Sequence, residues 1–114
     1  ADVEIIITTD HGSIRTTNPS KVVGDRNVNS NLRYKLGKNL SYNNREVYEV
    51  KHPERIGLPA PNLSTTYIFA TGDKFFACPN NYNHYVQYYK DTFQHGGISM
   101  EEMLVPYIVL KPKK

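Results

Sequence analysis

Two short, nearly unbroken apolar runs lie close to the two ends of the chain. Residues 3–9 contain Val3 and three consecutive isoleucines, and residues 107–110 read Tyr-Ile-Val-Leu. A strand that is apolar at consecutive positions, and not only at alternate ones, is typical of a helix-covered sheet with both faces buried. We therefore predict that these two strands are neighbours in a mostly parallel sheet and that both are buried.

The pattern between these runs is less regular. Residues 12–46 mix Pro, Gly and many Asn with short apolar pieces, which indicates an extended excursion that contains at most a short hairpin. Residues 46–51 alternate in polarity and predict a half-buried strand. The apolar runs 66–70 and 74–78 flank the turn sequence Thr-Gly-Asp and predict a β-hairpin.

Two helical signals follow. Tyrosines at positions 82, 85 and 89 have helical spacing and predict a short helix between residues 82 and 93. Ser99 followed by Glu102 forms a capping box, which predicts about one helical turn that ends before Pro106. Together with the strands, these signals indicate an α/β fold.

Composition narrows the class of protein. The 114 residues allow one modest domain, and the single cysteine, Cys78, excludes an internal disulfide and favours the reducing cytoplasm. No apolar stretch approaches the roughly 20 residues of a membrane span, and no signal peptide is recognisable. The chain begins without Met directly on a strand of the buried type. We therefore expect a partial domain, residues 1–114, whose upstream half is absent.

Candidate chemistry lies near both ends of the chain. Asp10 and His11 follow the first strand, and His95 precedes a Gly-Gly pair that allows close backbone approach. One carboxylate and two imidazoles form a mixed oxygen and nitrogen ligand set that suits zinc or manganese. The alternative is ordinary turn chemistry, in which Asp10 and Gly12 form a turn and His95 is a polar residue before another turn.

The net charge of +3 is concentrated in one segment. Asp25 is the only acidic residue among the basic residues there, and asparagines are interleaved. Guanidinium, ammonium and amide groups could cradle phosphate oxygens, and Arg33 and Lys38 are the candidates for substrate binding. A solvated basic loop or a small nucleic-acid-binding surface would explain the same residues. The segment contains Arg15, Lys21, Arg26, Arg33, Lys35 and Lys38.

The string Asp10-His11-Gly12 after a strand, paired with His-Gly-Gly-x-Ser-x-Glu-Glu-x-x-Val-Pro over residues 95–106, resembles the alkaline phosphatase superfamily. Within that superfamily the chain resembles the PglZ domain. Segments 21–43 and 88–94 are similar to the C-terminal part of PglZ output domains in two-component response regulators that control type IX secretion. The resemblance covers essentially all 114 residues.

This resemblance implies the C-terminal portion of an alkaline-phosphatase-like α/β sandwich and a two-metal hydrolase of phosphoesters. With the three candidate ligands and the basic, Asn-rich segment, we expect a phosphodiesterase that acts on nucleotides or oligonucleotides. The resemblance implies that Asp10 and His11 bind one zinc or manganese ion and that His95 binds the second. The nucleophile would lie upstream, so the fragment alone would be inactive. Its partners would be the upstream half of its own domain or a second copy, in a homodimer or swapped oligomer. A metal-containing protein-interaction module without essential catalysis is the alternative.

Overall fold

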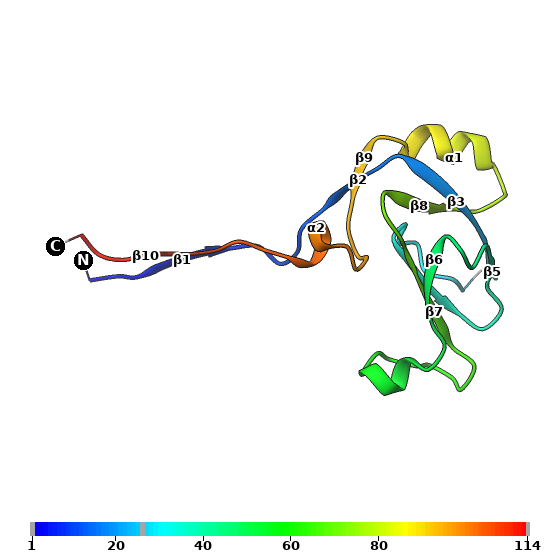
Figure 1. Ribbon diagram of the computed structural model, residues 1–114, viewed down its shortest axis with the longest axis horizontal. Helices are drawn as coiled ribbons and strands as arrows, with labels where there is room; N and C mark the ends of the chain where they lie inside the picture. The colour runs from blue at the N-terminus through cyan, green and yellow to red at the C-terminus, as the bar shows by residue number, and fades with distance from the viewer. Residues whose placement is uncertain (1, 26, 114) are drawn as a thin grey trace.

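The computed structural model describes residues 2–25 and 27–113, and it consists of a ribbon and a lobe (Figure 1). The ribbon pairs β1 (Ile5–Thr8) with β10 (Tyr107–Leu110) in antiparallel register. The radius of gyration is 17.7 Å, whereas a compact domain of this length has a value of roughly 13 Å. The projecting ribbon accounts for this elongation, and it carries both ends of the described chain away from the lobe.

The lobe extends from β2 to β9, and its described residues form eight short strands in three sheets. The first sheet pairs β2 (Ile14–Thr16) with β9 (Thr92–Gln94). In the second, β3 (Asn18–Val23) lies between β5 (Ser41–Tyr42) and β8 (Lys74–Ala77). In the third, β7 (Thr66–Ala70) lies between β4 (Tyr34–Gly37) and β6 (Val47–Val50).

The helices are short. The predicted tyrosine helix is confirmed as α1 (Tyr82–Tyr89), and the capping box starts α2 (Met100–Met103) as predicted. A 3₁₀ turn, η1 (Pro53–Ile56), lies at the lower end of the lobe in Figure 1. In the described chain no helix combines the length and the apolar character needed to cross a membrane.

Apolar side chains from both three-stranded sheets form the core of the lobe. The cluster is partly lined by Leu40 and Tyr42, which pack against its edge. Burial of these side chains supplies the main driving force for packing the two sheets together. The buried members of the cluster are Val22, Val47, Ile68, Ala70 and Phe76.

The prediction of a mostly parallel sheet with buried terminal strands is wrong for this structure. Among the described strands only β3 and β8 pair in parallel. The strands β1 and β10 are neighbours, but they run antiparallel, and Ile5, Ile7 and Val109 are 52%, 48% and 39% exposed. A continuous apolar run indicates that a strand suits burial on both faces, but it does not identify what covers it.

The predicted β7–β8 hairpin is also wrong, although both strands exist. They follow each other in the chain but belong to different sheets, because β7 pairs with β4 and β6 whereas β8 pairs with β3. The supposedly irregular residues 12–46 supply β2, β3, β4 and β5. Two of these strands take the place of the predicted hairpin partners, because β4 pairs with β7 and β3 pairs with β8. The half-buried strand predicted at residues 46–51 is confirmed as β6.

Candidate functional site

The ribbon meets the lobe at a junction formed by residues 9–12 and 95–104. There the imidazole rings of His11 and His95 stack, with ring centroids 3.8 Å apart and planes inclined by 14°. His11 lies just after β1, and His95 lies just after β9. The structure therefore brings together two candidate ligands that lie near opposite ends of the sequence.

Asp10 lies beside His11, and its Oδ1 atom is 3.6 Å from His11 Nε2. The Nδ1 atom of His11 lies 2.7 Å from the Gly12 carbonyl oxygen. Because a carbonyl can only accept, Nδ1 is the donor, and the lone pair of a neutral ring is on Nε2. Two ligand atoms on one tetrahedral zinc ion lie about 3.4 Å apart when each bond to the metal is about 2.1 Å long. Asp10 and His11 therefore suit a shared ion.

The ligand set is incomplete within this chain. Within residues 2–25 and 27–113, no group of three His, Cys, Asp or Glu side chains is arranged to hold a metal ion. Zinc sites use three or four protein ligands. The donor chemistry of Asp10, His11 and His95 thus fits a metal site only in part, and their role as ligands stays a prediction.

Two glycines allow the close backbone packing of the junction, as the sequence predicts. The Gly12 N–H donates to the Glu102 carbonyl oxygen at 2.8 Å, and a Cβ at Gly12 would lie 1.9 Å from the Glu101 oxygen. Gly96 has a φ of +104°, and a Cβ there would lie 2.5 Å from Asn31 Nδ2. No residue with a side chain fits at either position without a shift of its neighbours.

The buried carboxylate of Glu102 stabilises the junction through hydrogen bonds. Glu102 accepts hydrogen bonds from Arg33 Nη2 at 2.7 Å, from Ser99 Oγ at 2.7 Å and from the Gly97 N–H at 2.6 Å. Burial raises the pKa of Glu102, but the hydrogen bonds from Arg33, Ser99 and Gly97 outweigh it, so that the pKa is lowered. Glu102 is therefore held ionised where residues 97–99 meet Arg33.

The structure gives Arg33 a structural role in place of the predicted contact with substrate. Its side chain is fully buried against Glu102, and Nη1 donates to the Lys74 carbonyl oxygen at 2.6 Å. This ion pair joins residues 69 positions apart. A guanidinium engaged in this way does not face a phosphate in solvent.

Lys38, the second candidate for substrate binding, does not lie beside Arg33. Lys38 is exposed and follows β4, whereas Arg33 precedes β4, so the two lie roughly 16 Å apart along an extended strand. Arg26 lies outside the described residues. Substrate binding by Lys38 stays a prediction.

Sequence reasoning missed two residues that hold the site. Asn31 Nδ2 donates to the His95 carbonyl oxygen at 3.1 Å, and its Oδ1 accepts the Arg33 N–H at 2.7 Å. Nothing in the Asn-rich segment distinguishes Asn31 from its neighbours. Glu102 was visible as a capping residue, but that motif reports only the local partner Ser99.

Comparison with known proteins places the chain in a family. A family model described as the BREX system PglZ alkaline phosphatase-like domain matches residues 1–110. No curated protein matches the chain. The match includes both histidine segments of the junction and nearly the whole lobe and ribbon. The chain therefore belongs to the PglZ family of alkaline phosphatase-like domains.

Proposed function

We propose that this chain supplies part of the metal site of a metal-dependent phosphodiesterase that acts on nucleotides or oligonucleotides. Family membership indicates a function of the phosphoesterase type. The observation that carries the finer proposal is the stacking of His11 on His95 beside the Asp10 carboxylate. Oxygen and nitrogen donors at one point are the chemistry that zinc or manganese requires.

In this proposal, Asp10 and His11 hold one ion and His95 holds the other. Bound zinc, or manganese as the alternative, would lower the pKa of a hydroxyl nucleophile and offset charge on phosphoryl oxygens. The Gly12 carbonyl oxygen fixes the His11 tautomer, and Asn31 fixes the backbone at His95. We assign the nucleophile and the remaining ligands to residues outside this chain, so we expect the chain alone to be inactive.

Hydrolysis of bis(p-nitrophenyl) phosphate by the longer protein that contains this chain tests the proposal. We expect cleavage with zinc or manganese, and a loss of more than about 100-fold in His95→Ala because a ligand is removed. His84→Ala, which changes an exposed histidine on α1, is the matched control and should keep full activity. Absence of cleavage with both metals, or full activity in His95→Ala, would overturn the proposal.

A metal-containing protein-interaction module is the second candidate, because the exposed apolar ribbon offers a surface for a partner. His95→Ala separates the two functions: loss of hydrolysis with intact signalling would favour interaction, and loss of both would favour catalysis.

We also propose that the chain belongs to a cytoplasmic response regulator that controls type IX secretion. This proposal rests on the segments 21–43 and 88–94 and on the single cysteine.

A further inference from the structure

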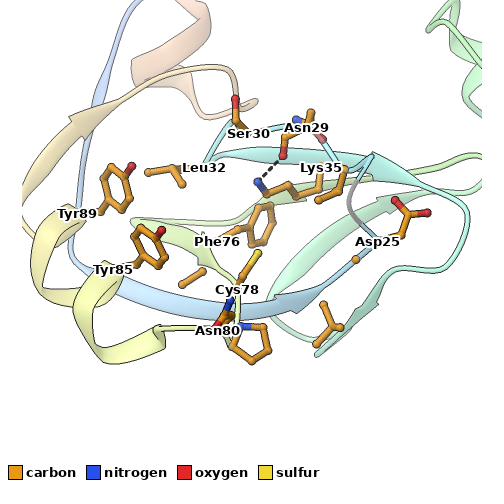
Figure 2. A pocket seen from close by; sticks show the side chains of 15 residues that line it. Asp25, Asn29, Ser30, Leu32, Lys35, Phe76, Cys78, Asn80, Tyr85 and Tyr89 are labelled. Carbon is orange, nitrogen blue, oxygen red and sulfur yellow. Dashed lines mark hydrogen bonds between the residues drawn. The ribbon is translucent and has the colours of Figure 1, made fainter.

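The lobe contains a cavity of about 660 Å³ that the metal-site proposal does not use (Figure 2). It opens between the end of β3, the loop before β4, the end of β8 and α1. Its volume is within the range of small-molecule sites, about 300–1,000 Å³. Phe76 and Leu32 form apolar parts of its lining, as is usual for a ligand site, and Asp10, His11 and His95 are not among its lining residues.

Lys35 places a positive charge in the wall of this cavity. Its side chain extends from β4 among the lining side chains, is only 5% exposed, and donates from Nζ to the Asn29 carbonyl oxygen at 2.7 Å. In the part of the chain that the structure describes, no ion pair involves Lys35. An ammonium has three donors, and a buried ammonium is normally paired with an anion. Burial lowers the pKa of Lys35, and the neighbouring Cys78 partly offsets this effect. Asp25 is the carboxylate among the lining residues, and in the described chain it forms no ion pair with Lys35.

Two aromatic rings form another part of the wall. Tyr85 and Tyr89 lie one helical turn apart on α1, with ring centroids 6.2 Å apart and planes inclined by 16°. Both line the cavity, and Tyr85 is 39% exposed, so its ring can be reached from solvent. Nearly parallel tyrosine rings provide faces on which a planar ring can stack.

We propose that this cavity binds a small aromatic molecule that carries one anionic group. The anion, a phosphate or a carboxylate, would form an ion pair with Lys35. The aromatic ring would pack against Tyr85 and Tyr89. Because the cavity does not include the candidate metal ligands, this site and the proposed phosphodiesterase can fail independently.

Isothermal titration calorimetry of the chain tests the charge requirement. The probes are adenosine 5′-monophosphate for the phosphate source, benzoate for the carboxylate source, and adenosine without an anion. We expect at least one anionic probe to bind, and Lys35→Met to weaken it about tenfold or more, because Met keeps the apolar stem but not the charge. Lys51→Met removes the charge of an exposed lysine outside the cavity and should leave the affinity unchanged.

A second variant keeps the test decisive if Lys35→Met fails to fold. Tyr85→Leu changes a partly exposed side chain and should weaken the bound probe about fivefold or more by removing a stacking face. Binding of adenosine as tightly as of its monophosphate, unchanged affinity in either variant, or no binding of either anionic probe would overturn the proposal. Binding of one anionic probe alone would support it and identify the anion as phosphate or carboxylate.

Discussion

Glu102 ties the junction to the lobe through its bonds to Arg33, Ser99 and Gly97. Glu102→Gln would leave the guanidinium of Arg33 buried without its counter-charge, since both side chains are almost fully buried. Breaking a buried pair from one side costs about 3–5 kcal/mol. We expect a loss of that size in the free energy of unfolding, measured by urea titration. Glu101→Gln, at the exposed neighbouring position, should change it by less than about 0.5 kcal/mol.

The lowered pKa of Glu102 also predicts a dependence of stability on pH. The pKa is below its ordinary value of about 4.5 in the folded chain, despite burial, because of the bonds from Arg33, Ser99 and Gly97. Stability from this group is therefore complete above about pH 4.5 and falls as the pH drops through the folded pKa. Thermal melts between neutral and acid pH should show this loss, and Glu102→Gln should remove a part of it. Equal acid sensitivity in the two proteins would contradict this account.

Gly12 offers a test of the junction that does not depend on metal. A Cβ at this position would meet the Glu101 oxygen at 1.9 Å, so we expect Gly12→Ala to separate the two backbone segments. The His11 and His95 rings would then lose their stacking, which is visible as the loss of mutual ring-current shifts in NMR spectra. Ser13→Ala, at the next exposed position, should retain these shifts. Retained stacking in Gly12→Ala would show that the junction tolerates a side chain there.

Local signals predicted the helices but not the strand partners. The spacing of tyrosines and the capping box each act within one or two helical turns, and both α1 and α2 are present. Pairing of β7 with β4 depends on a short strand whose Asn- and Gly-rich surroundings carry no clear period, and the alternating pattern that predicted β6 does not identify its partner. Arg33 was misassigned for a similar reason, because its partner Glu102 lies 69 positions away. The position of His11 after a strand could be predicted because the apolar run over residues 3–9 ends just before it, whereas no strand was predicted before His95, which follows β9.

We propose that the chain associates with itself through the exposed surface of the ribbon. Apolar side chains on β1 and β10 are exposed, and both outer edges of this two-stranded ribbon lack a further strand in the described chain. Such edges pair readily with other chains. We expect sedimentation equilibrium to show dimers or larger species, and Ile6→Lys to shift them toward monomers. Leu63→Lys, at a fully exposed position in the lobe, should not. A wild-type chain that stays monomeric at high concentration would refute this proposal.

The ribbon also determines the order in which the chain can fold. Thr8 Oγ1 donates to the Pro106 carbonyl oxygen across 98 positions, which is close to the full length of the chain. Closing so large a loop costs conformational entropy before any contact is gained, so pairing is favourable only after the lobe has drawn the two strands together. Pairing of β2 with β9 brings the two chain segments together at the junction. The strands β1 and β10 can then pair progressively, starting from the junction. The His11–His95 pair is therefore assembled late, and a growing polypeptide has no such pair until His95 has been synthesised.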